Sequence, residues 1–126
     1  MGESKIESFE DLEVYQKLCD LHLEMNEQSL KFPQFELFEL GSQLRRASNS
    51  SPANIAEGGN NRHINIYLEG INRAMGELQE TLHHLRMAFK KGYFSEKDHE
   101  GYRGRYLEAA RMLRGLEKSL MGSRNR

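Results

Sequence analysis

Residues 64–89 read INIYLEGINRAMGELQETLHHLRMAF, and the apolar side chains in this stretch recur alternately four and three positions apart. The series consists of Ile64, Leu68, Ile71, Met75, Leu78, Leu82, Leu85 and Phe89. Such spacing forms one apolar seam along a long helix that packs at a shallow angle against its neighbours. The stretch therefore predicts a helix over about residues 61–91, roughly 45 Å long at about 1.5 Å per residue.

Two more helices are predicted before this one. Ser8, followed by acidic residues, is a typical N-cap for a helix over about 9–31, which must stop before Pro33. A second helix over about 35–58 ends at a pair of glycines. Its apolar positions stay on one helical face on both sides of Pro52, so we expect the helix to continue through this residue with a kink.

The last predicted helix follows a clear break. Gly92 ends the long helix, and Ser95 with the acidic residues after it begins another over about 96–121. The low content of valine, isoleucine and threonine gives extended strands little support. Four helices with short connections predict an all-α fold, in which residues 1–126 form a single antiparallel up-down-up-down four-helix bundle.

Composition excludes several classes of protein. Charged residues make up 29% of the 126 and hydrophobic ones 37%, and the single cysteine excludes an intramolecular disulfide. The charged start of the chain and the lack of a long apolar run argue against a signal peptide and a membrane span, so we expect a cytoplasmic protein.

Charge is unevenly distributed along the chain. Residues 1–60 carry 11 acidic and 5 basic side chains, whereas residues 61–126 carry 8 acidic and 13 basic ones. This asymmetry favours self-complementary assembly or a basic surface for a polyanion, while the net charge of -1 argues against a strong general nucleic-acid binder.

The first helix carries two apolar stripes about 140° apart. One stripe consists of Leu12, Tyr15, Cys19, Leu23 and Leu30, and the other consists of Val14, Leu18, Leu21 and Met25. A bundle needs one stripe from each helix, so we expect the first to enter the core and the second to form an oligomer interface. The alternative is a first helix wedged so deeply that the second stripe is core as well.

Glutamate and histidine three positions apart occur twice, at Glu80 with His83 and at Glu96 with His99. Four-helix bundles can hold two metal ions with such pairs when all the ligands point inward. The first pair points away from the seam of its own helix, and the second lies at one end of the bundle. We therefore expect no catalytic residue, no metal site, no cofactor and no enzymatic activity.

Basic residues give a stronger candidate site. The last helix carries four of them within about 80° of one another and away from its seam: Arg103, Arg111, Arg114 and Lys118. A second, weaker cluster consists of Arg45, Arg46 and Arg62. Guanidinium groups bind phosphates in a bidentate way, so both clusters are candidates for nucleic-acid binding. The alternative is a solvated face balanced by nearby glutamates.

Four strings, FEDLEVYQK (9–17), SQLRRASNSSPANIAEG (42–58), YLEGINRAMGELQETL (67–82) and KKGY (90–93), carry a family resemblance. They resemble the bacterial four-helix-bundle family named after intervening sequences in large-subunit (23S) ribosomal RNA. The resemblance implies an antiparallel bundle, a ring-shaped homopentamer and no enzymatic activity. It also implies distant kinship with the accessory protein of diversity-generating retroelements, a non-catalytic partner of a reverse transcriptase to which nucleic-acid binding is attributed.

The family's characteristic residues, carried over by position, are Gln43, Arg45, Arg46, Ser51, Pro52, Asn54, Glu57 and Gly58. Asn54 and Glu57 could equally form a structural network that satisfies the carbonyl freed by Pro52 and a neighbouring arginine. We expect a non-catalytic homo-oligomer that binds RNA or a nucleic-acid-handling protein through its arginines. The alternative is a protein-protein scaffold in which the arginines are structural.

Overall fold

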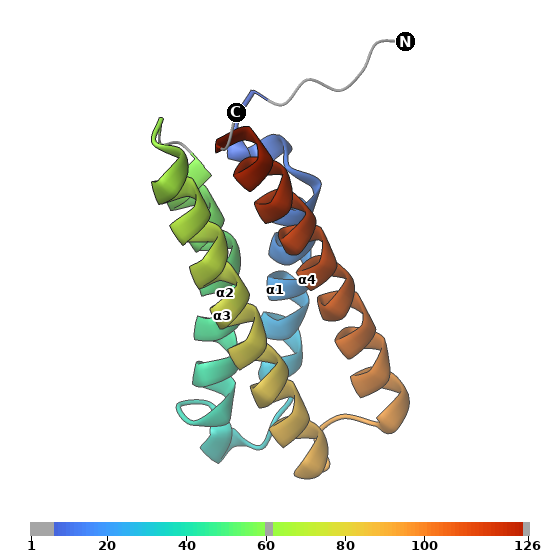
Figure 1. Ribbon diagram of the computed structural model, residues 1–126. Coiled ribbons are helices and arrows are strands. Elements are labelled where there is room, and N and C mark those ends of the chain that lie inside the picture. The colour runs from blue at the N-terminus through green and yellow to red at the C-terminus, as the bar shows by residue number, and fades with distance from the viewer. Residues whose placement is uncertain (1–6, 60–61, 125–126) are drawn as a thin grey trace.

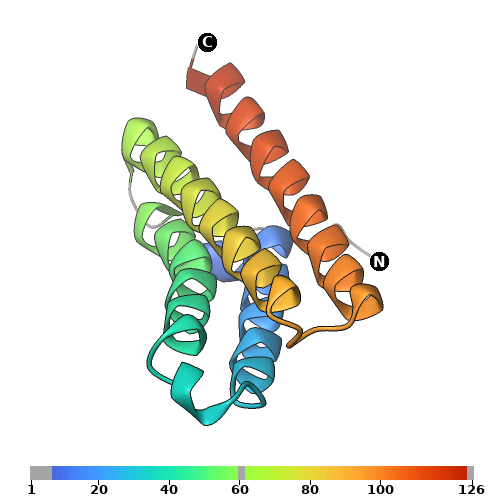
Figure 2. The ribbon, with the colours of Figure 1, turned by 90° about the horizontal axis from the view of Figure 1, so that it is seen from below.

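The computed structural model describes residues 7–59 and 62–124, which contain four α-helices, two 3-10 helices and no strand. The elements are η1 (Phe9–Asp11), α1 (Glu13–Ser29), η2 (Gln34–Glu36), α2 (Leu40–Gly59), α3 (Ile64–Lys90) and α4 (Glu96–Arg124). Consecutive helices run in opposite directions (Figure 1). Each contacts the next, and α1 also contacts α4, which closes the bundle (Figure 2). The predicted all-α antiparallel four-helix bundle is confirmed.

The predicted helix ends are largely where the chain has its caps. Ser8 accepts a hydrogen bond from the Glu10 amide, and Ser95 Oγ accepts one from the Asp98 amide at 3.1 Å. Gly92 has a positive φ of 85°, the backbone conformation that ends α3. Residue 61, where the third helix was predicted to begin, lies outside the described residues, and α3 begins at Ile64.

The first two helices differ from their predicted bounds. Ser8 caps the short η1 rather than α1, because Leu12 is extended (φ -69°, ψ 125°) and separates the two. α2 begins at Leu40, not at residue 35 as predicted. Residues 34–36 form η2 and residues 37–39 a turn, and the Glu36 carboxylate accepts a hydrogen bond from the amide of Leu40, the first residue of α2, at 3.4 Å.

The prediction for the faces of α1 was wrong. Val14, Leu18, Leu21 and Met25 are at most 4% exposed and belong to the core of the single chain. Leu23 and Leu30, which were assigned to the core, are each 61% exposed. α1 contacts both α2 and α4, and these four apolar side chains belong to the core that the helices share. The four residues assigned to an oligomer interface are therefore core, and they take the place of the first stripe, so the alternative in which both stripes are core is not met either.

Helices α2 and α3 approach each other closely at two glycines, Gly58 and Gly70. A Cβ atom on Gly70 would lie 2.7 Å from the Asn54 carbonyl oxygen and 3.2 Å from the Gly58 Cα atom. Nearer the start of α2, and four residues beyond Gly70 in α3, Ser51 Oγ donates a hydrogen bond to the Ala74 carbonyl oxygen at 2.8 Å. This pair of helices therefore depends on small side chains at the crossing.

Candidate nucleic-acid interface

The four basic residues predicted on the last helix form an exposed stripe along α4, which we call the α4 stripe (Arg103, Arg111, Arg114 and Lys118). Within the described part of the chain, no carboxylate lies within ion-pair distance of any of them. Arg105, on another face of α4, is instead paired with Glu24 of α1, which lowers the pKa of that carboxyl. The stripe thus carries positive charge that the described fold does not neutralise.

The charges of α3 are sorted between its two flanks. Three glutamates, Glu69, Glu77 and Glu80, each pair with an arginine of α2 or of α3 itself. The flank toward α4 carries no acid between Ile64 and Lys90, because the helical period places amides and cations there. Its exposed polar residues are Asn72, Gln79, His83, Arg86 and Lys90. The basic stripe therefore faces a flank of the neighbouring helix that adds positive charge.

A groove of about 390 Å³ lies between these two flanks, and we call it the α3–α4 groove. From α3 it is lined by Gln79, Leu82, His83 and Arg86, and from α4 by His99, Arg103 and Leu107. Leu82 and Leu107 are partly buried, whereas the two arginines are exposed. The ring of His99 is 5% exposed and stacks on Phe89, with centroids 4.6 Å apart and planes 10° apart. The groove thus combines apolar walls with a cationic rim.

Sequence reasoning did not assign Arg86, Gln79 or Leu107 to a site. Equal distances from the turn at residues 91–95 would pair Arg86 with Glu100 and Leu82 with Gly104. The groove instead brings Arg86 together with Arg103 and Leu82 with Leu107, a register shifted by three residues on α4. The spacing within each helix carries no signal for this shift.

Arg45, from the second predicted cluster, is held inside the fold. Its guanidinium donates hydrogen bonds to Ser29 Oγ at 2.9 Å and to the Leu37 carbonyl oxygen at 2.7 Å. These bonds join the end of α1, the connection after η2 and the first half of α2. The structure therefore gives Arg45 a structural role and removes it from the open surface.

Arg46 is also engaged by the fold. It pairs with Glu77 at 3.4 Å and with Glu80, both on α3, and these carboxylates raise the pKa of its guanidinium. Glu80 in turn contacts His84 Nε2 at 3.2 Å. Arg62, the third member of the cluster, is exposed just before α3, far along the chain from both. The structure does not bring the three predicted arginines together.

The family-characteristic residues of α2 differ in their surroundings. α2 continues through the buried Pro52, as predicted. Asn54 Nδ2 donates to the Ser50 carbonyl oxygen at 2.8 Å rather than to that of Ser48, the one freed by the proline. Gly58 is a crossing residue, whereas Gln43 and Glu57 are exposed. Glu57 has no ion pair within the described residues, so neither of the two contacts predicted around the proline is present there.

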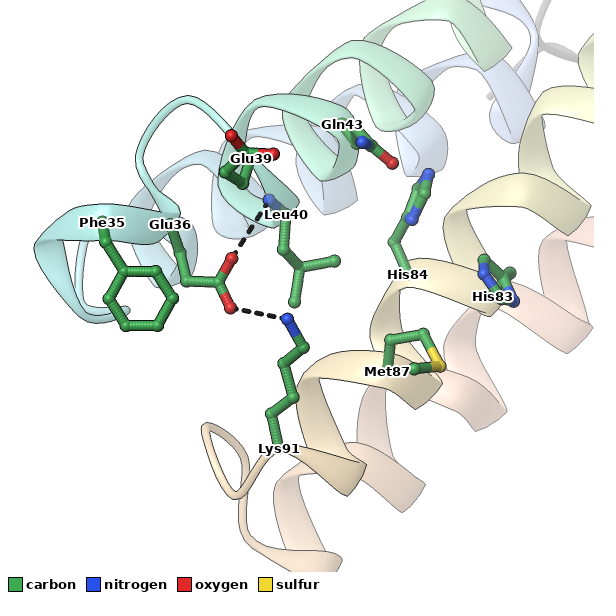
Figure 3. A pocket seen from close by; sticks show the side chains of 9 residues that line it. All are labelled: Phe35, Glu36, Glu39, Leu40, Gln43, His83, His84, Met87 and Lys91. Atoms are coloured by element: carbon green, nitrogen blue, oxygen red, sulfur yellow. Dashed lines mark hydrogen bonds and ion pairs between the residues drawn. The ribbon is translucent and has the colours of Figure 1, made fainter.

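A second pocket, of about 370 Å³, lies between η2, α2 and α3 (Figure 3). Its carboxylate Glu36 is 1% exposed and accepts hydrogen bonds from Lys91 Nζ at 2.9 Å and Tyr93 Oη at 2.7 Å. These partners hold the pKa of Glu36 below its usual value. Figure 3 shows Phe35 beside Glu36 at the mouth of the pocket, and His83 at its far edge. With Glu36 and Glu39 in its lining, this pocket is poorly suited to an anionic ligand.

The two Glu-x-x-His spacings do not converge. Among the described residues, no group of three or more histidine, cysteine, aspartate or glutamate side chains is arranged to hold a metal ion. His83 is exposed, and His99 is buried against Phe89.

Comparison with known proteins places this geometry in a family. The family model of the 23S rRNA-intervening sequence protein matches residues 10–115. The chain belongs to this family. No curated protein has significant sequence similarity to it. The match covers all four helices up to the α4 stripe residue Arg114, and it points to an RNA-related role.

No helix in the described ranges has both the length and the apolar character needed to cross a membrane.

Proposed function

We propose that the protein is a non-catalytic RNA-binding protein whose contact surface is the α3–α4 face, made of the α4 stripe with Arg86 and Lys90 of α3. The single observation that carries this proposal is that the α4 stripe is exposed and free of carboxylate partners within the described chain, beside an acid-free flank of α3. Membership of a family named after ribosomal RNA intervening sequences supports the same conclusion.

The sorting of charges explains how a chain of net charge -1 can bind a polyanion. The electrostatic effect of a charge in solution falls off over about 10 Å at an ionic strength of about 0.1 M. The potential that a polyanion meets at a surface therefore depends mainly on the charges near that surface. The acids of α3 are paired with arginines on its other flanks, and Glu24 of α1 is paired with Arg105. The α3–α4 face thus carries six cations, the four of the α4 stripe with Arg86 and Lys90, against Glu100 and Glu117 of α4, which leaves it net positive.

Salt dependence tests this proposal. Binding of a fluorescent single-stranded RNA should weaken linearly on a log-log plot, with a slope of about -0.7 for each phosphate neutralised. Arg114→Gln should weaken binding and make the slope shallower by about one contact. Lys31→Gln removes an exposed cation just after α1 and should leave both the affinity and the slope unchanged. Failure of the protein to retain RNA at about 50 mM salt would refute the proposal.

A second candidate function is that of a protein-protein scaffold, including self-association into the homopentamer implied by the family resemblance. It is favoured by large apolar side chains left in solvent: Leu23, Leu30, Phe35 and Phe38, which are 61–84% exposed. These residues lie on the outer face of α1 and in the connection to α2, and they replace the interface predicted from the sequence. Light scattering of a double variant, Phe35→Ser with Phe38→Ser, tests this second function. An oligomer of unchanged size would exclude these two residues from the interface.

A further inference from the structure

We infer that the α3–α4 groove holds one unpaired nucleotide of a single-stranded RNA, and that the phosphates next to it follow the α4 stripe. This inference rests on the proposed function and deepens it, because it names the form of RNA and the place where a base is bound.

The size and shape of the groove suit one nucleotide. Its volume of about 390 Å³ lies at the small end of the range of about 300–1,000 Å³ that is usual for small-molecule sites. Leu82 and Leu107 face each other from the two helices and are partly buried. A base lying between them would remove apolar surface on both walls from water, whereas a paired and stacked base cannot enter a groove between two helices.

The polar groups of the groove match the polar parts of a nucleotide. Gln79 is exposed at the edge and presents a carbonyl oxygen and an amide group, which can accept from and donate to the edge of a base. Arg86 and Arg103 form the rim with five N–H donors each, and no carboxylate lines the groove. A phosphate attached to the bound base would therefore meet two guanidinium groups.

The α4 stripe provides the continuation of the strand. It extends from Arg103, at the groove, to Lys118, fifteen residues further along α4, which is about 22 Å at about 1.5 Å per residue. A backbone leaving the groove toward the C-terminal end of α4 would meet one cation after another over that length. We therefore expect the α4 stripe to position the strand through its phosphates and the groove to discriminate between strands through the bound base.

The test compares a single-stranded RNA of twelve nucleotides with a duplex of the same sequence by fluorescence anisotropy. Gln79→Glu places a negative charge at the groove without a packing change, and we expect it to weaken single-strand binding about tenfold or more. Gln34→Glu makes the same change at an exposed site in η2 and should have no effect. Leu107→Trp should fill the groove with a similar loss. Duplex binding should change less than about threefold in both groove variants.

A 2-aminopurine base in the single strand provides a second readout, because its fluorescence should rise when it leaves the stack of its neighbours and enters the groove. The rise should be absent in Leu107→Trp and present in Gln34→Glu. Equal binding of single strand and duplex, unaffected by either groove variant, would overturn this inference and leave the proposed function standing. Displacement of the RNA by micromolar free nucleoside monophosphate would overturn it in favour of a free nucleotide as ligand, and loss of all RNA binding by the unaltered protein would overturn both proposals.

Discussion

The close crossing of α2 and α3 at Gly70 leads to a stability prediction with a control in the same helix. Adding one methyl group at Gly70 would place it 2.7 Å from the Asn54 carbonyl oxygen, whereas ordinary contacts begin at about 3.4 Å. The obstacle is backbone, so α2 and α3 would have to separate by about 0.7 Å. Overpacking of this kind costs about 1–3 kcal/mol, and the better helix propensity of alanine offsets about 1 kcal/mol of it.

Gly76→Ala isolates the steric part of this cost. Gly76 lies in the same helix, is exposed and has open space at its Cβ position, so its replacement should stabilise the protein by about 1 kcal/mol. The difference between Gly70→Ala and Gly76→Ala removes the propensity term and should be about 1–3 kcal/mol. Urea unfolding followed by circular dichroism measures it. Two variants of equal stability, within about 0.5 kcal/mol, would refute the close crossing of α2 and α3.

Three further predictions concern residues whose sequence assignment changed or could not be made. Leu18→Ala should cost about 2–5 kcal/mol in urea melts and Leu23→Ala less than about 0.5 kcal/mol, and the reverse order would restore the original assignment of the α1 faces. Arg45→Ala should lower the free energy of unfolding by about 1.5–3 kcal/mol because two charge-assisted hydrogen bonds are lost. A urea melt identical to that of the unaltered protein would contradict this role. Because the pKa of Glu36 is lower in the folded state, its stabilising effect is complete above the ordinary carboxyl pKa of about 4.3 and is lost as the pH falls through the folded-state value. Glu36→Gln should therefore flatten the acid side of the stability profile, and unchanged acid sensitivity would rule this role out.

The sequence predicted the fold because each helix except α1 has one dominant apolar face. In α3, the seam through Ile71, Leu78 and Leu85 is buried as its spacing indicated. α1 carries two apolar stripes of similar strength, and the choice between them depends on the positions of α2 and α4, which helical periodicity does not contain. The wrong stripe was assigned to the core for this reason.

The site could be predicted only in part, since a cation on a helix says nothing about its partner. The α4 stripe was found because its spacing alone defines it. Arg45 and Glu36 were not recognised as internal groups. Arg45 donates to the Leu37 carbonyl oxygen in an irregular connection, and the partners of Glu36, Lys91 and Tyr93, are 55 and 57 positions away in the sequence. The α3–α4 groove depends on the register between two helices, and the positions of the helix ends do not fix it, since a symmetric hairpin would place Arg86 opposite Glu100.

The closure of the bundle by α1 against α4 has a consequence for the order of folding. Within the described residues, it is the only contact between α-helices that are not consecutive in the chain, and it carries the ion pairs Arg105–Glu24 and Lys17–Glu108. Every other helix pair can form as a local hairpin with a short loop, whereas this one must close a loop of most of the chain at greater entropic cost. Helix α4 should therefore dock last on α1 and be released first. Its amide hydrogens should exchange with solvent through a partial opening that leaves those at the α2–α3 crossing protected.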